Sequence, residues 1–221
     1  MTEHPADSDL GHVVTNIQVV VDEGAFVASS ASISCRTRDV YTEQMTVKVV
    51  IAEGTIFHPE SNLVFWLPPS SIEYIIHVGS HNIFEERCHI SITIDSVDTC
   101  EEWKAIGSYN TFHCKSRVEG FVTSIGDDNV LEAASCIHFT NSGSVGKGVV
   151  LTPALRYQPL DKHDNEVLTD VVLYQVPRGH IHRRPHSLSS DESQLAFYRA
   201  PQRAMTQTLL TFLTKYHAKL S

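Results

Sequence analysis

Histidine is the residue type in this sequence with the widest chemical scope, since thirteen of its 221 residues are histidines. An imidazole can act as a general base near neutral pH, and three neutral imidazoles that converge can bind zinc. Five cysteines add thiols, but they are an odd number, widely spaced and without a CxxC pair. Such thiols are typical of a reducing compartment, so we expect the chain to be cytosolic.

Two histidines are placed to serve as a general base. His113 and His138 each directly follow an apolar residue of a regular pattern, so their side chains are expected to point outward. There either imidazole could deprotonate a hydroxyl or an amine. A single surface histidine is more often solvated or structural, so its role depends on the elements that position it.

Charge and apolar content exclude several classes of partner. Lys plus Arg total 17 against 26 Asp plus Glu, which gives a net charge of −9 and argues against nucleic acid. The longest apolar runs are far shorter than the roughly 20 residues of a membrane span, so no direct membrane insertion is expected. The acidic N-terminus lacks the basic and apolar regions of a signal peptide.

Apolar residues recur every six positions along much of the chain, whereas helical and alternating patterns are weak there. This period is typical of a triangular β-solenoid in which each side supplies a short strand and a corner. One coil cannot bury its apolar residues alone, so coils must stack. The expected core consists of Val21, Val27, Ile33, Ile51, Phe57, Leu63, Val78, Phe84, Ile90, Ile106, Phe112, Val118, Ile125, Leu131, Ile137, Val145 and Leu151.

The corners of the expected solenoid carry small residues or asparagine two positions before most of the second and third apolar residues of each coil. Three corners share a pattern of Gly, two further residues and Asn, and they end at Asn82, Asn110 and Asn129. Gly and Asn tolerate the positive φ that tight corners need. Stacked asparagines are also expected to hydrogen-bond to the coils above and below.

The predicted fold is an all-β solenoid, a left-handed parallel β-helix of hexapeptide repeats with about six to seven coils and a C-terminal α-helix. Apolar residues at helical spacing predict that amphipathic helix near the end of the chain. The segment 36–47 does not follow the repeat. The expected segments are an acidic flexible tail (1–16), the β-helix (17–177), a linker (178–200) and the helix (201–221), with loop insertions near 64–77, 91–105 and 158–170.

Aromatic residues on two insertions are candidate interface residues. A thin solenoid has little local core for an apolar loop to enter, so an exposed loop of this kind would mark a contact surface. The alternative is that the loop folds against the C-terminal helix. The candidates are Phe65, Trp66 and Trp103.

Several segments resemble the dynactin subunit 6 family. Three of them are similar to coils of that family, and the end of the chain shares its final strand, basic linker and helix. The resemblance spans about residues 17–220. The matching segments are 50–59, 78–85, 125–132, 171–174, Arg183-Arg184 and 213–220.

The resemblance implies a non-catalytic structural and interaction subunit of the dynactin pointed-end group, which supports dynein-driven transport along microtubules and the engagement of cargo and adaptors. The implied partners are a dynactin subunit 5-like β-helix, the dynactin p62 subunit and the pointed-end actin-related protein. The implied location is the cytoplasm, in association with the cytoskeleton, and the kinetochore. On this interpretation no cofactor, metal or catalytic residue is expected.

The hexapeptide repeat also occurs in enzymes, so the fold alone does not specify an activity. One alternative is a homotrimeric acyltransferase, with His113 or His138 as the general base facing acetyl-CoA in a cleft between subunits. The other is a γ-carbonic-anhydrase-like enzyme, a class that uses three histidines and an Arg-Gly-Asp motif. Here His77 and His113 lack a third ligand, since Val118 stands at the expected place, and residues 36–39 lack the glycine.

Overall fold

The computed structural model of the chain describes residues 11–38, 45–68, 73–94, 102–159, 166–175, 181–185 and 192–217. Several sequence predictions fall outside these residues. They concern most of the expected tail, part of the unassigned segment, the centres of the three insertions, parts of the expected linker and the last residues of the chain. The ranges outside the description are 1–10, 39–44, 69–72, 95–101, 160–165, 176–180, 186–191 and 218–221.

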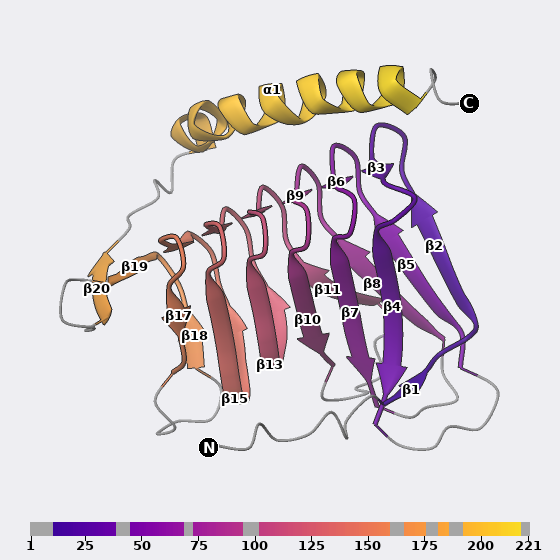
Figure 1. Ribbon diagram of the computed structural model, residues 1–221, viewed down its shortest axis with the longest axis horizontal. Coiled ribbons are helices and arrows are strands. Elements are labelled where there is room, and N and C mark those ends of the chain that lie inside the picture. Colours follow the sequence, from indigo (N-terminus) through magenta and orange to yellow (C-terminus); the bar gives the residue numbers. More distant parts are fainter. Residues whose placement is uncertain are drawn as a thin grey trace.

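The chain winds into coils, and each complete coil contributes strands to three parallel rows (Figure 1). The first row contains β2 (Ile17–Val21), β5 (Val47–Ile51), β8 (Tyr74–Val78), β11 (Glu102–Ile106) and β18 (Glu166–Leu168). The second contains β3 (Phe26–Val27), β6 (Ile56–Phe57), β9 (Ile83–Phe84), β12 (Thr111–Phe112), β14 (Val130–Leu131), β16 (Val149–Leu151) and β19 (Val171–Gln175). The third contains β4 (Ser32–Thr37), β7 (Asn62–Leu67), β10 (His89–Thr93) and β17 (Arg156–Tyr157).

Two long strands run around a corner of the solenoid. β13 (Arg117–Ile125) and β15 (Cys136–Val145) begin in the third row and end in the first. They therefore join these two rows into one sheet of twelve strands, while the second row forms a separate sheet of eight. The structure is a parallel β-solenoid, and seven of the eight strands in the second sheet are parallel. None of the helices described is long and apolar enough to cross a membrane.

Two short antiparallel strands, which the repeat pattern did not predict, pair with edge strands of the two sheets. β1 (His12–Val13) pairs with β4, although residues 1–16 were expected to be a flexible tail. β20 (Ile181–Pro185) pairs with β19, although 178–200 was expected to be a linker. Both predictions were wrong in these positions. Terminal strands have unpaired backbone groups, and an added strand satisfies them without needing an apolar pattern of its own.

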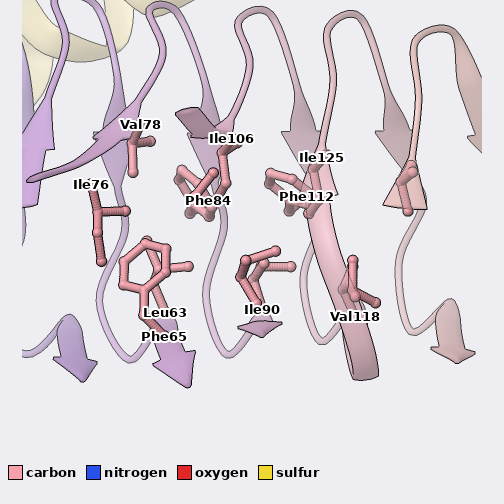
Figure 2. Close-up of a cluster of buried hydrophobic side chains, with 14 of the residues drawn as sticks. Leu63, Phe65, Ile76, Val78, Phe84, Ile90, Ile106, Phe112, Val118 and Ile125 are labelled. Carbon is pink, nitrogen blue, oxygen red and sulfur yellow. The ribbon is translucent and has the colours of Figure 1, made fainter. Parts of the chain in front are cut away.

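The core is a column of apolar side chains that stack from coil to coil (Figure 2). Phe57 stacks on Phe84 with ring centroids 4.1 Å apart, and Phe84 stacks on Phe112 at 4.9 Å. The structure buries the expected core residues from Ile51 to Leu151 to 2% exposure or less. Each coil contributes too few apolar groups to form a core alone, and stacking is what removes them from water.

The first coil departs from the expected core. Val21 is 43% exposed and does not belong to the buried core, so its assignment was wrong. Val27 and Ile33 are half-buried and pack against the core from one side. The reason is positional, because β2 and β3 end their rows and no preceding coil covers them.

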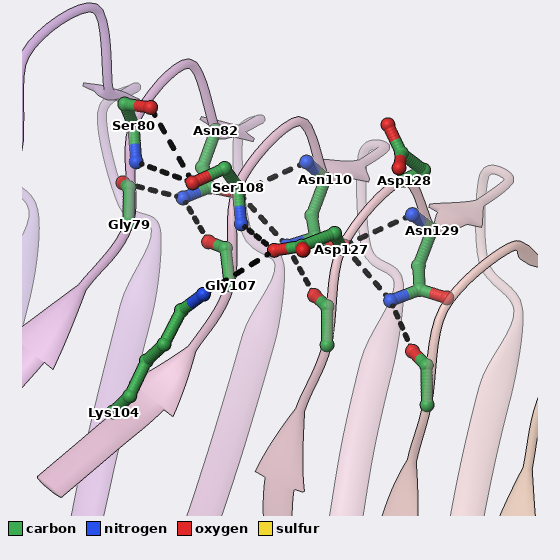
Figure 3. A network of polar contacts seen from close by, with 12 residues as sticks. Gly79, Ser80, Asn82, Lys104, Gly107, Ser108, Asn110, Asp127, Asp128 and Asn129 are labelled. Carbon is green, nitrogen blue, oxygen red and sulfur yellow. Dashed lines mark hydrogen bonds and ion pairs between the residues drawn. The ribbon is translucent and has the colours of Figure 1, made fainter. Parts of the chain in front are cut away.

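Buried asparagines connect three successive turns (Figure 3). The Asn110 side-chain amide donates hydrogen bonds to the Asn82 side-chain oxygen and the Gly126 carbonyl, both at 2.9 Å. Its own side-chain oxygen accepts from the Asn129 backbone N–H at 3.0 Å and from the Asn129 amide at 2.9 Å. Asn82 and Asn129 make corresponding bonds to their neighbours, so each turn is fastened to the next.

The glycines of these turns are required for close approach between coils. A Cβ placed on Gly79 would lie 2.4 Å from the Gly107 carbonyl oxygen, so no larger residue fits. The positive φ angles fall instead on His81, Tyr109 and Asp128, at 56°, 62° and 61°. The positive φ was expected on Gly and Asn, but in these three turns it falls on the residue before the asparagine.

Helix α1 (Glu192–His217) lies along the same row of turns (Figure 1). It begins nine residues before the expected start at 201 and contains Pro201 in its interior. Proline lacks an N–H and usually ends a helix, which is why the pattern indicated a later start. Here the helix continues through Pro201 because the solenoid binds it on both sides of the proline. Arg199 makes the contact before Pro201, and residues after it make the others.

Asn110→Ala tests the asparagine connection. The change leaves the buried Asn129 backbone N–H and the Gly126 carbonyl without their Asn110 partners. We expect the free energy of unfolding to fall by roughly 2–4 kcal/mol, the cost of stranding buried polar groups. Urea unfolding monitored by circular dichroism measures it. Asn141→Ala, at an exposed position of β15, is the matched control and should change stability little; equal losses in both variants would contradict the interpretation.

Candidate functional site

A second row of turns, between the second and third rows of strands, places His58, Glu85, His113 and Glu132 one above another. Each is the first residue after a short strand of the second row. The strand register aligns the residues that precede them, Phe57 with Phe84, Phe112 and Leu131. Histidine and glutamate therefore alternate over four successive coils. We call these four residues the His–Glu row.

His113 has a carboxylate on each side. Its Nδ1 lies 3.1 Å from Oε1 of Glu85, and its Nε2 lies 3.6 Å from Oε2 of Glu132. The other oxygen of Glu85 accepts the Cys114 backbone N–H at 2.9 Å, so this carboxylate is held at both atoms. The side chains of His113, Glu85 and Glu132 are 31%, 28% and 39% exposed. A held imidazole is thus accessible from solvent.

The hydrogen bond to Glu85 determines the tautomer of His113. A carboxylate accepts and cannot donate, so the proton shared with Glu85 is carried by Nδ1. In the neutral ring Nε2 is then an acceptor, and it lies on the side of Glu132. An imidazole oriented in this way by a carboxylate has the arrangement of a general base, because the carboxylate stabilises the imidazolium that forms when Nε2 takes a proton.

Other histidines are less suited to this role. His58 is only 15% exposed, and its Nδ1 lies 3.3 Å from Glu86. His89 bonds to Asn62 at 3.1 Å, and burial, followed by Arg117 and Arg36, lowers its pKa against an opposing effect of Glu119.

His138, the second candidate base, lies on β15 opposite Glu119 of β13. No hydrogen bond joins its ring to another residue in the described part of the chain. Of the two histidines selected from the sequence, His113 is therefore the one with an orienting partner.

The thiols near the site are not activated. Burial raises the pKa of Cys114, and the neighbouring Glu86 and Glu85 raise it further. The Cys114 Sγ lies 3.4 Å from Oε2 of Glu86 and donates to it. Burial raises the pKa of Cys35 and of Cys88 to about 12. These thiols are protonated at neutral pH, so none of them is a ready nucleophile.

Metal ligands do not converge in this part of the molecule. Across the described ranges no group of three His, Cys, Asp or Glu side chains could hold a metal ion. His77 lies on β8 with its Nε2 3.8 Å from Glu102, away from the turn that carries His113. The two histidines considered for zinc therefore belong to different rows.

Sequence reasoning selected His113 but missed Glu85 and Glu132. A signal was present, since all members of the His–Glu row directly follow the second apolar residue of their coil. Residues at equivalent positions of stacked coils are neighbours in space, although Glu85 and Glu132 stand 28 residues before and 19 residues after His113. Comparing coils position by position would have shown the alternation.

The candidate interface residues are placed differently from one another. Phe65 is fully buried, so its prediction as an exposed contact residue was wrong; alternation along β7 directs it inward with Leu63 and Leu67. Trp66 points to the other side of β7, is half-buried and donates from Nε1 to Ser91 Oγ at 3.1 Å. Trp103 on β11 is also half-buried.

Helix α1 occupies the opposite, asparagine-lined row of turns. Arg199 makes two hydrogen bonds to the Asp128 carboxylate, at 2.7 and 2.5 Å, and its guanidinium lies 4.4 Å from the Tyr109 ring centroid. Arg203 donates to the Tyr109 hydroxyl at 2.7 Å. Thr206 is 1% exposed and lies 3.4 Å from His81 Nδ1. These polar groups hold the helix, and the His–Glu row is the more accessible cluster.

Comparisons with known proteins find similarity to solved structures alone. No family model matches the chain, and no curated protein matches it. A Bacillus cereus protein assigned as an acetyltransferase is a solved structure similar to this chain, with 11% identity, a TM-score of 0.22, and coverage of 90% of this chain and 99% of that one. Another is the UDP-N-acetylglucosamine O-acyltransferase of Moraxella catarrhalis, with 15% identity, a TM-score of 0.28, and 93% of both chains covered.

The expectation of a non-catalytic dynactin subunit is corrected by these findings, since both structures are described as acyltransferases and no comparison names dynactin. The expected absence of enzyme activity is corrected with it. The resemblance to the dynactin subunit 6 family, its partners and its cellular location stay predictions. At such low identities and TM-scores the two structures carry no argument about substrate or mechanism, which must come from the residues of this chain.

The contact between α1 and His81 predicts a pH dependence of stability. Burial lowers the pKa of His81 below its usual 6.5, and Arg203 lowers it further against an opposing effect of Glu53. The unfolded chain therefore binds more protons at this position, so the contribution of neutral His81 is complete above pH 6.5 and is lost as the pH falls through the folded pKa. Melting temperatures between pH 7.5 and pH 5 measure this loss.

His81→Asn is the variant for this test, because asparagine tolerates the positive φ of the position. We expect it to melt with a weaker dependence on pH than the unaltered chain. His138→Gln serves as the control and should retain the full dependence. A slope unchanged by His81→Asn would contradict the assignment.

Proposed function

We propose that this chain is an acyltransferase of the hexapeptide-repeat type, wound as a left-handed parallel β-helix, in which His113 is the general base. The observation that carries the proposal is the partly exposed imidazole of His113, held at Nδ1 by Glu85 with Nε2 left as an acceptor beside Glu132. The six-residue period supports the left-handed winding, which is typical of this repeat.

The proposed reaction moves an acyl group from the sulfur of acetyl-CoA to a hydroxyl or amine. His113 Nε2 takes the proton of the acceptor while its oxygen or nitrogen attacks the thioester carbonyl carbon. The tetrahedral intermediate then collapses, the bond from carbon to sulfur breaks, and the thiolate receives the proton from the imidazolium. The acceptor proton ends on the thiol, and no oxidation or reduction occurs.

Glu85 is a positioning residue in this scheme. It accepts the Nδ1 proton of His113 and the Cys114 backbone N–H, so its rotation is restricted. Its negative charge stabilises the imidazolium during proton transfer, as the carboxylate of a catalytic triad does. A homotrimer would place a neighbouring solenoid beside this row and complete a cleft around His113.

His113→Ala tests the proposal. Acetyl-CoA consumption, followed by release of the free thiol with a panel of amines and alcohols, should fall by roughly 10²- to 10⁴-fold in kcat, the usual contribution of a general base. Mass measurement of the purified chain should show a trimer. Circular dichroism of the variant confirms that the solenoid remains folded.

His138→Ala is the matched control, since it removes an imidazole from an outward position without a carboxylate hydrogen bond. It should retain the turnover of the unaltered chain. If His138→Ala loses activity while His113→Ala keeps full activity, the base is His138 and the assignment to His113 is wrong. A trimer or monomer without turnover toward any acceptor would reject the acyltransferase.

A further inference from the structure

Two hydrogen-bond acceptors face one another on the exposed side of His113. Nε2 of the neutral ring and Oε2 of Glu132 lie 3.6 Å apart. This distance exceeds the 2.7–3.2 Å of an ordinary N–H···O bond, so no direct hydrogen bond satisfies the pair. A donor placed beside both atoms would be needed to join them.

The number of protons on the acceptor group decides which chemistry fits this pair. A hydroxyl has one proton and can donate to Nε2 or to Glu132, but not to both. A primary amine has two protons and its ammonium form has three. One nitrogen about 2.9 Å from both atoms can therefore donate to each at the same time.

The charges around the site favour a cation as well. Glu85, Glu86 and Glu132 bring three carboxylates to neighbouring turns. Arg87, on the same turn as Glu86, is engaged by Glu60 at 2.6 Å. Lys115 is the exposed lysine of the His113 turn and offsets part of this charge. A negative potential attracts an ammonium group and gives a neutral alcohol no such advantage.

We propose that the acyl acceptor of this site is a primary amine and that Glu132 is the residue that selects it. This inference rests on the proposed acyl transfer at His113. Glu132 binds the ammonium form, which releases one proton to solvent water before it reacts, and Glu132 then keeps a hydrogen bond to the neutral nitrogen. No role in proton transfer is assigned to Glu132, so it acts in binding and specificity.

The step balances as an aminolysis of an acyl thioester. The amine lone pair forms the bond from nitrogen to the carbonyl carbon, and His113 Nε2 removes one of the two remaining nitrogen protons. The bond from carbon to sulfur breaks, and the thiolate takes the proton from His113. The products are an amide and a thiol, and Glu132 remains ionised throughout.

Matched acceptors test the inference directly. We would compare 2-phenylethylamine with 2-phenylethanol, and glucosamine with glucose, with acetyl-CoA as donor and the full chain as enzyme. Amines should be acylated with the higher kcat/KM in both pairs. Glu132→Gln should lower kcat/KM for the amines by roughly ten- to a hundredfold, mostly through KM, as expected when a hydrogen bond to a charged group is lost.

Glu86→Gln is the matched control, since it removes the same charge from a neighbouring turn and lies beside His58 and Cys114 rather than His113. It should leave the preference for amines in place. An equal loss in both variants would show that overall charge, and not Glu132, attracts the acceptor, and would overturn the role of Glu132.

A binding measurement separates this inference from the proposed function. In a chain with ¹³C-labelled histidine rings, 2-phenylethylamine without acetyl-CoA should shift the His113 signal, and Glu132→Gln should abolish the shift. An amine-dependent shift without turnover would reject acyl transfer and retain the amine site. Turnover that prefers alcohols would reject the amine inference and retain acyl transfer. The absence of both amine turnover and an amine-dependent shift would overturn the inference.

Discussion

Hydrogen bonding between successive coils is the interaction on which the rest of this molecule depends. Strands of the three rows pair only with their neighbours above and below, and the buried asparagines continue that pairing where the turns leave no room for larger groups. Asn110 both donates to Asn82 and accepts from Asn129, so it fastens three coils at once. Equal spacing of the coils follows, and it allows aromatic rings such as Phe84 and Phe112 to stack.

The same regularity builds the candidate site. Strands pair at about 4.8 Å, so side chains at equivalent positions of neighbouring coils come into hydrogen-bond reach without a dedicated loop. His113 meets Glu85 and Glu132 for this reason, although many residues separate them along the chain. A row of alternating histidine and glutamate is therefore a direct product of the solenoid. Its position on an outward turn makes the imidazole accessible, and its carboxylate neighbours determine which ring nitrogen can accept a proton.

The two rows of turns have different uses because one is covered. Helix α1 binds the asparagine-lined row with Arg199, Arg203 and Thr206, through hydrogen bonds and contacts with Tyr109 and His81. Burial there lowers the pKa of His81, so the contact is sensitive to pH. In the other row the carboxylates keep substantial exposure, and polar groups remain available for a ligand.

The six-residue period by itself determined the solenoid, its stacked core from Ile51 to Leu151 and the special role of the three asparagines, because each of these depends on local spacing that repeats along the chain. Tertiary structure decided the rest. Val21 is exposed because no coil precedes it, β1 and β20 form because terminal strands need partners, and α1 continues through Pro201 in a chain whose solenoid binds it. The repeat already gave Glu85 and His113 equivalent positions, but only the tertiary structure decided that their side chains meet at hydrogen-bond distance, because that depends on how neighbouring coils stack.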